Sequence, residues 1–346
     1  MFRAKTTPLN TYAGTWIVMA GMGVVALAGA AFLGFSFDRA SAVNAAITAA
    51  IPITLHLFYT RIRPDTYIGP VCGAGAVLYV SSIVGGTISL VALGTGVPLI
   101  DASLAWLDAG MGFDVGKFTG FLAQWPGAIL LLRACYGAIV PTILLTAVIL
   151  VLIKRTDRLW EFCFVYVGTL TTCALISAFL PAIGAFVHYS LDRDVLERLP
   201  QGAGVYYVKQ FVAFRFEGWR VINLLDIKGV VNFPSFHCCM ALLTAYAYRG
   251  LGLVSALVYA FSGLVIVSCV PLGGHYLSDI VAGAAVWGAF VAITRLRPRV
   301  ASHGQANTSA ARPASLDATP EQLVSRFRSS PEFAARSEAN FGIEGH

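Results

Sequence analysis

Long apolar runs alternate with short polar connections over most of the chain. Several runs reach or exceed the roughly 20 residues that an α-helix needs to cross the hydrocarbon core of a bilayer. Backbone polar groups inside that core must be hydrogen-bonded within the segment, which favours helices. We therefore predict about eight membrane-spanning helices, near 15–35, 40–59, 68–93, 127–153, 159–187, 235–248, 251–270 and 276–294.

The amino-acid composition points to the same class of protein. Hydrophobic residues make up 57% of the 346 residues and charged residues only 12%, whereas soluble domains carry about 25% charged residues. The predicted fold class is all-α, a polytopic helical bundle in the lipid bilayer. The net charge of +6 comes from basic residues that flank the spans and fill two loops, so it indicates membrane topology and no nucleic-acid partner.

Three segments lack this apolar character. Aromatic and charged residues are mixed in 94–125, which is typical of an interfacial or re-entrant segment. A polar loop is expected over 188–232. The end of the chain, 300–346, is rich in Ala, Ser, Arg and Glu and is predicted to be a disordered tail, because its scattered apolar residues are too few to form a core.

Seven cysteines occur without a CxxC spacing, and most of them fall in apolar runs. This distribution favours small buried side chains over a disulfide framework or a zinc site. No metal and no cofactor are expected. The first apolar run is expected to remain as a span, since no convincing cleavage site follows it.

Basic residues near the ends of the spans predict the orientation of the chain. They recur at every second junction, a pattern that marks the cytoplasmic side. Both termini are then cytoplasmic in a multi-pass protein of the cell membrane, and the 188–232 loop lies outside. The residues on the cytoplasmic side are Arg3, Lys5, Arg61, Arg63, Lys154, Arg155, Arg158, Arg249, Arg295, Arg297 and Arg299.

Two histidines occur at predicted span ends on the external face. His275 and Asp279 are four residues apart and would share one helix face. A carboxylate bonded to one imidazole nitrogen makes the other nitrogen a better nucleophile or base. His237 opens the helix that leaves the same face, and Ser235 lies at its N-terminus, where amide groups and the helix dipole favour an anion.

The preceding loop adds Lys209, Arg215, Arg220 and Lys228. Cations, amide donors, one oriented histidine and a second histidine suit phosphoryl transfer. Arg215, Arg220, Lys228 and Ser235 are the candidate phosphate-binding residues, and His275, His237 and Asp279 are the candidate catalytic residues. In the alternative hypothesis the protein is a transporter or scaffold, in which these histidines relay protons or only pack. Ionisable groups at membrane depth are costly and usually functional.

Two sequence motifs resemble those of a known family. Phe233-Pro234-Ser235-Phe236-His237 and Gly274-His275-Tyr276-Leu277-Ser278-Asp279 resemble the second and third motifs of the type 2 phosphatidic acid phosphatase (PAP2) superfamily. The resemblance is greater to its inositolphosphotransferase-like branch, which includes inositol phosphorylceramide synthase. It implies a six-helix core, within a catalytic transmembrane domain over 67–299 that follows an N-terminal transmembrane hairpin over 1–66.

The resemblance also implies roles for the three catalytic candidates. His275 would attack phosphorus and form a phosphohistidine, Asp279 would orient it, and His237 would protonate the leaving group. The substrate would be a phospholipid or a prenyl phosphate at the external leaflet. Water or an acceptor alcohol would then resolve the intermediate, so that both a lipid phosphotransferase and a lipid phosphatase remain open.

The sequence departs from the phosphatase pattern at three points. Phe236 replaces the glycine of the second motif, and Cys269 stands where the third motif has a phosphate-binding arginine. The first motif, Lys-x6-Arg-Pro, is absent from the loop before His237. The changes at Phe236 and Cys269 tilt the expectation slightly toward the transferase.

Overall fold

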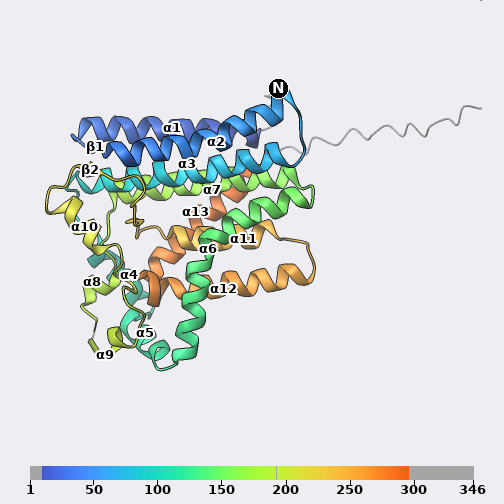
Figure 1. Ribbon diagram of the computed structural model, residues 1–346. Helices are drawn as coiled ribbons and strands as arrows, with labels where there is room; N and C mark the ends of the chain where they lie inside the picture. Colours follow the sequence, from blue (N-terminus) through green and yellow to red (C-terminus); the bar gives the residue numbers. More distant parts are fainter. Residues whose placement is uncertain (1–9, 192, 296–346) are drawn as a thin grey trace, which may run out of the picture. The chain divides into compact units, whose positions relative to one another are not determined.

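The computed structural model describes residues 10–191 and 193–295 (Figure 1). Nearly all of its regular structure is helical, with two strands of two residues each. The elements are α1 (Thr11–Phe32), β1 (Ser36–Phe37), α2 (Arg39–Leu57), η1 (Phe58–Ile62), α3 (Ile68–Leu93), α4 (Asp101–Gly110), α5 (Val115–Ala123), α6 (Pro126–Leu152), α7 (Thr156–Phe179), α8 (Ala185–Tyr189), α9 (Arg193–Glu197), α10 (Val208–Arg215), β2 (Val221–Ile222), α11 (Phe236–Ala247), α12 (Leu253–Gly273) and α13 (Leu277–Arg295). The segment 300–346, predicted to be disordered, lies outside the described residues.

Seven helices in the described part of the chain are long and apolar enough to cross a membrane: α1, α2 with η1, α3, α6, α7, α12 and α13. The helical membrane fold predicted from the sequence is thereby confirmed. The remaining predicted span is the shorter helix α11, which has 12 residues. At 1.5 Å per residue its length is about 18 Å, and it is enclosed by α6, α7, α12 and α13.

The structure corrects one predicted boundary and adds short helices to two of the connecting segments. The span expected over 159–187 ends at Phe179, because Pro181 disfavours a helical conformation at the residue before it. The polar 188–232 segment is more ordered than a loop, since it contains α9, α10 and β2. The interfacial segment forms the two short helices α4 and α5.

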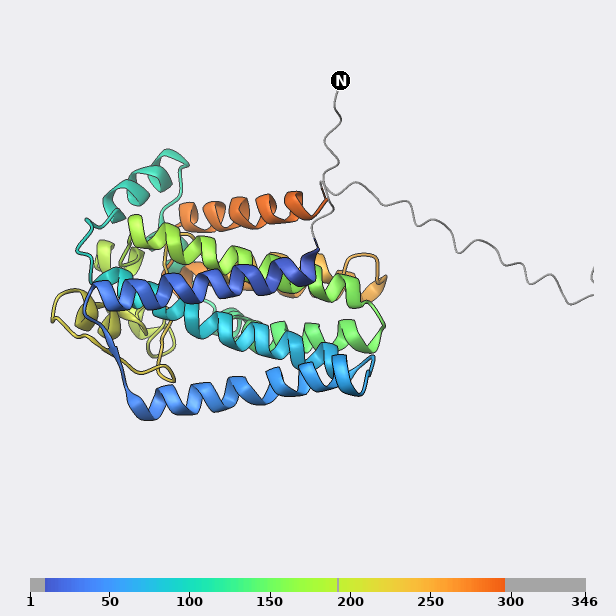
Figure 2. The same ribbon diagram turned by 90° about the horizontal axis from the view of Figure 1, so that it is seen from above.

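Helices α3 and α7 form the centre of the bundle. They contact each other and α1, and α2 packs on the other side of α3. About two-thirds of each central helix is buried in the protein, compared with about a fifth of α1 and α2. Figure 2 accordingly shows α2 at the margin of the bundle, where its exposed apolar residues would face lipid.

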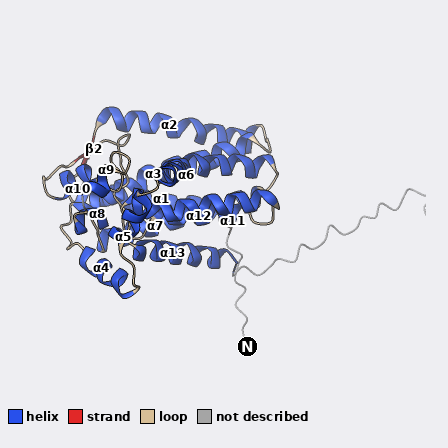
Figure 3. Ribbon diagram, turned by 90° about the horizontal axis from the view of Figure 1, so that it is seen from below, coloured by secondary structure: helices blue, strands red, loops and turns tan. Residues whose placement is uncertain are grey.

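The short elements gather at one end of the long helices. Figures 1 and 3 both place α4, α5, α8, α9, α10 and β2 there. Strands β1 and β2 pair in parallel, with Ser36 opposite Val221 and Phe37 opposite Ile222. This pairing fastens the connection between α1 and α2 to the segment that leads into α11.

Candidate active site

A tight turn at the end of α12 places His275 in the interior. Gly274 adopts a left-handed conformation with φ of 71°, which glycine tolerates best. A Cβ atom there would lie 2.5 Å from the carbonyl oxygen of Gly204. His275 therefore stands in the connection between α12 and α13, two residues before α13 begins, and only 3% of it is exposed.

His275 and Asp279 are in direct contact. Nδ1 of His275 lies 3.1 Å from Oδ2 of Asp279, and the backbone N–H of Tyr276 donates to the same oxygen at 2.9 Å. Asp279 is completely buried. A carboxylate on Nδ1 fixes the imidazole tautomer with a proton there, so that Nε2 carries a free lone pair.

Ser235 joins the second motif to the third. It is the N-cap residue of α11, and its hydroxyl oxygen accepts from the N–H of Cys238 at 3.3 Å. The same hydroxyl lies 3.3 Å from Nε2 of His275, and the N–H of Ser235 donates to the carbonyl oxygen of Asp279 at 3.0 Å. Gly283 permits this approach, because a Cβ atom on it would lie 2.4 Å from the Ser235 carbonyl oxygen.

His237 faces the same space from the first turn of α11. Its ring centroid is 6.4 Å from that of His275. Tyr136 of α6 stacks on it, with centroids 4.5 Å apart and planes inclined by 10°. The sequence did not reveal this partner of His237, because nothing distinguishes a tyrosine within an apolar run about a hundred residues away.

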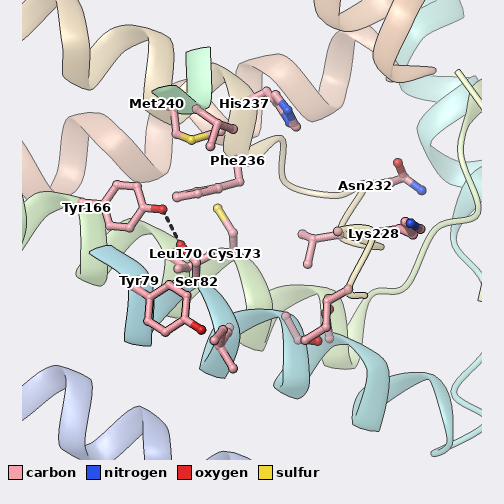
Figure 4. A pocket seen from close by; sticks show the side chains of 18 of the residues that line it. Tyr79, Ser82, Tyr166, Leu170, Cys173, Lys228, Asn232, Phe236, His237 and Met240 are labelled. Carbon is pink, nitrogen blue, oxygen red and sulfur yellow. Dashed lines mark hydrogen bonds between the residues drawn. The ribbon is translucent and has the colours of Figure 1, made fainter. Parts of the chain in front are cut away.

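Both histidines line a cavity of about 440 Å³. Its far walls come from α3 and α7 and are mostly apolar or aromatic. In Figure 4, His237, Asn232 and Lys228 lie toward one end, and Tyr79, Tyr166, Leu170 and Met240 toward the other. A hydrogen bond of 2.9 Å between Ser82 and Tyr166 crosses from α3 to α7 in that second region. The cavity thus has a polar end at the histidines and an apolar remainder.

The three basic residues predicted to bind phosphate differ in whether they line the cavity. Lys228 lines the cavity and also forms an ion pair with Asp226. Arg215 and Arg220 do not line it. Arg215 donates to the carbonyl oxygen of Val97, whereas the guanidinium of Arg220 donates to the carbonyl oxygen of Trp219 and lies 4.8 Å from the centroid of the Phe35 ring.

The physical reason for this separation is the path of the loop. Its α10–β2 portion folds against Phe35 and the pairing strand β1, which carries both arginines toward the N-terminal helices. Tyr206, before α10, and several residues from Leu224 to Asn232, after β2, are the parts of this loop that line the cavity.

Phe236 and Cys269, the two departures from the phosphatase pattern, are both interior residues. Phe236 lines the cavity and packs edge-on against Tyr166, with centroids 5.4 Å apart. Cys269 is completely buried, its thiol donates to the Val265 carbonyl oxygen, and its own carbonyl oxygen accepts from the N–H of His275. Cys269 thus holds the turn before His275 through its backbone.

Burial sets the protonation state of His275. It lowers the pKa of this histidine from 6.5 to about 4, because removal from water disfavours the charged imidazolium. The side chain is therefore neutral near pH 7. A neutral imidazole whose Nδ1 is bonded to a carboxylate can act as a nucleophile through Nε2.

The fold described here is that of a multi-pass helical membrane protein whose candidate site contains two histidines and a carboxylate. A family model described as PAP2 superfamily matches residues 102–293, which is more than half of the chain. The chain therefore belongs to the PAP2 superfamily, whose members are phosphatases or phosphotransferases. No curated protein and no solved structure matched it.

Proposed function

We propose that this protein is a membrane enzyme that transfers a phosphoryl or phospho-head group from a lipid or lipid-linked substrate through a phosphohistidine on His275. The observation that carries this proposal is the arrangement of its imidazole. Nδ1 faces the buried Asp279 carboxylate, and Nε2 faces the cavity-lining start of α11. This orientation presents the nucleophilic nitrogen to the space where a phosphate would bind.

The first step forms the bond between Nε2 of His275 and phosphorus and breaks the bond between phosphorus and the leaving oxygen. His237 would enter this step as an imidazolium, because the negative charge of the bound phosphate favours its protonated form; it gives that proton to the leaving oxygen and becomes neutral. Asp279 stabilises the positive charge that develops on the imidazole of His275. In the second step neutral His237 takes the proton of an acceptor hydroxyl. The acceptor oxygen then attacks phosphorus and releases His275.

The phosphate would lie between His275, the first turn of α11 and Lys228. The unpaired amide groups at a helix N-terminus favour an anion, and Lys228 adds a positive charge at the same end of the cavity. The apolar walls formed by α3 and α7 suit the hydrocarbon part of a phospholipid or a prenyl phosphate. This two-part character supports a lipid substrate.

Transfer to an alcohol is the outcome we propose first, in the manner of the inositolphosphotransferase-like branch. Phe236 and Cys269 occupy positions where the phosphatases have glycine and arginine, and the chain resembles that branch in keeping the two histidines and the aspartate while the rest of the pattern is relaxed. Hydrolysis by water is the competing outcome for the same intermediate. The two activities differ in where the phosphoryl group ends: on the acceptor alcohol in the transferase, and as free phosphate in the phosphatase.

The experiment uses the purified full-length protein with ³²P-labelled phospholipid and prenyl phosphates, with and without alcohol acceptors. Label that moves to the alcohol supports the transferase, and free phosphate supports the phosphatase. His275→Ala is expected to abolish both, by at least about 10⁴-fold, as loss of an active-site nucleophile does. His188→Gln, at an exposed histidine of α8, is the control, and equal activity of the wild type and His275→Ala would refute the mechanism.

The site is further proposed to face the exterior, with both termini cytoplasmic. The basic clusters that flank the spans support this orientation, because they recur at the connections α2–α3, α6–α7 and α11–α12. Those connections lie at the end of the long helices opposite α4 and α5 (Figure 1). A cysteine introduced at Lys117 should react with an impermeant maleimide in intact cells, and one introduced at Arg155 should not.

A further inference from the structure

The turn that carries His275 is attached to α4, a helix that the proposed chemistry does not use. Asp108 of α4 is completely buried, and its two carboxylate oxygens accept from the backbone N–H groups of Leu277 and Ser278, both at 2.8 Å. These are the first two residues of α13. A carboxylate at this position satisfies free amide groups at the helix N-terminus and is favoured by the helix dipole.

A second buried carboxylate of α4 bonds to the residue directly after His275. Oδ1 of Asp101 accepts from the hydroxyl of Tyr276 at 3.1 Å, and the Tyr276 side chain is completely buried. Asp101 also accepts from the N–H groups of Ile183 and Gly184, at 3.0 and 2.9 Å.

The same network reaches the residue before His275. The N–H of Ala185, which follows Gly184, donates to the carbonyl oxygen of Gly274 at 2.9 Å. Residues 274 and 276–278 are therefore all held, directly or through one neighbour, by Asp101 and Asp108. The imidazole between them has little freedom to shift relative to Ser235 and His237.

We propose that Asp108 and Asp101 are positioning residues for His275. The inference rests on the proposed function, because it assigns them the task of holding the nucleophile in line with the phosphate. Attack on phosphorus requires this alignment, and a displacement of about 1 Å can cost roughly 100-fold in rate. A merely structural role would instead change the amount of folded protein and leave the chemistry of each folded molecule intact.

Two substitutions separate these roles. Asp108→Asn keeps the shape of the side chain but turns an N–H donor toward a backbone N–H, so one of the two bonds is lost. Tyr276→Phe removes only the bond to Asp101 and keeps the buried ring. Asp114→Asn is the matched control, because Asp114 caps the neighbouring helix α5 through the N–H of Lys117 at 2.9 Å.

The decisive measurement is the rate constant of phosphohistidine formation in a rapid-quench burst with labelled substrate, since that constant does not depend on the folded fraction. We expect it to fall at least about 10-fold in Asp108→Asn and about 3-fold in Tyr276→Phe. The KM of both test variants should stay at the wild-type value. The rate constant of the Asp114→Asn control should also equal that of the wild type. Wild-type rate constants in both test variants would overturn the inference.

A second measurement does not depend on activity. Diethyl pyrocarbonate acylates accessible imidazole nitrogens, and the extent of reaction at His275 can be read by mass spectrometry. Release of the turn should raise the reactivity of His275 in Asp108→Asn but not in Asp114→Asn. If the wild type forms no phosphohistidine, the proposed function fails while a raised reactivity still supports positioning. Unchanged reactivity in Asp108→Asn would overturn positioning itself.

Discussion

The hydroxyl of Ser235 lies 3.3 Å from Nε2 of His275, on the side opposite the Asp279 carboxylate. Two motifs that are 40 residues apart in the sequence thus share a single imidazole ring. The serine oxygen also accepts the α11 capping bond from Cys238, so its own proton is available for Nε2. In the proposed reaction, a phosphate that binds at Nε2 of His275 would displace this hydrogen bond, and the Ser235 hydroxyl would then lie beside the phosphate oxygens.

Replacement of Asp279 by asparagine should leave the fold intact but lower kcat. The amide keeps the size of the side chain and loses the charge that stabilises an imidazolium and sets the tautomer. We expect a loss of about 10³-fold to 10⁴-fold, with little change in KM. Steady-state kinetics on the purified variant measure this directly, and a kcat within threefold of the wild type would rule out the orienting role.

Tyr136→Ala should slow catalysis about threefold to tenfold, because the stacked ring that holds His237 is lost. Tyr136→Phe keeps the ring and should remain close to the wild type. The comparison is best made with leaving groups of different basicity. If Tyr136 supports proton donation by His237, the rate should fall more steeply with leaving-group basicity in Tyr136→Ala than in the wild type. An equal or shallower dependence would show that Tyr136 has no part in this proton donation.

Lys228→Ala should raise KM about tenfold, since this lysine is the one Lys or Arg side chain among the described residues that line the cavity. Lys209→Ala, at an exposed position on α10, is the matched control. Arg215→Ala and Arg220→Ala should leave KM unchanged, as their hydrogen bonds are made away from the cavity. A raised KM in either arginine variant, with wild-type KM in Lys228→Ala, would reverse this assignment of the phosphate-binding cation.

The rate of phosphohistidine formation should decrease on the acid side with a midpoint near pH 4. Burial lowers the pKa of His275 to about 4, and the nucleophile must be deprotonated. Between pH 6.5 and 4 the unfolded chain binds a proton at His275 that the folded protein does not bind. The free energy of unfolding therefore decreases as the pH falls through that window, by about 3 kcal/mol in total, and this group changes it no further below pH 4. A midpoint near 6.5 in a pH–rate profile would contradict a buried neutral His275.

At the other end of the bundle, Glu161→Gln should destabilise the protein by about 2 kcal/mol. Glu161 of α7 forms an ion pair of 2.7 Å with Arg249 and accepts from the hydroxyl of Tyr246 at 2.8 Å. The Glu161 side chain is 17% exposed and that of Arg249 32%, so the loss is below that of a fully buried pair. Glu197→Gln, in the exposed pair with Arg193, should have no measurable effect. Thermal unfolding in detergent compares them, and equal melting temperatures would refute the prediction.

The bundle itself could be predicted from hydropathy, because apolar runs of sufficient length have few alternatives to spanning helices. The short length of α11 could be predicted as well, because Arg249 and Gly250 interrupt the apolar stretch: the expected span 235–248 agrees closely with the observed Phe236–Ala247. The sequence grouped His275, Asp279, His237 and Ser235 as one candidate site because their spacing forms a chemical pattern, and the structure places the four side chains close together. Lys228 could not be separated from Arg215 and Arg220, because the path of a loop across a folded surface is not encoded in the spacing of its charges.

The pairing of β1 with β2 has a consequence for how this protein can be divided. The family match begins at residue 102, yet Tyr79 and Ser82 of α3 form part of the cavity wall. The loop that supplies Lys228 is fastened to β1 and, through the bond from the Leu224 N–H to the Ser41 hydroxyl, to α2. A chimera joined at the family boundary would exchange the histidines without the α3 wall of the cavity that they line. The smallest exchangeable unit of this protein therefore includes its N-terminal helices.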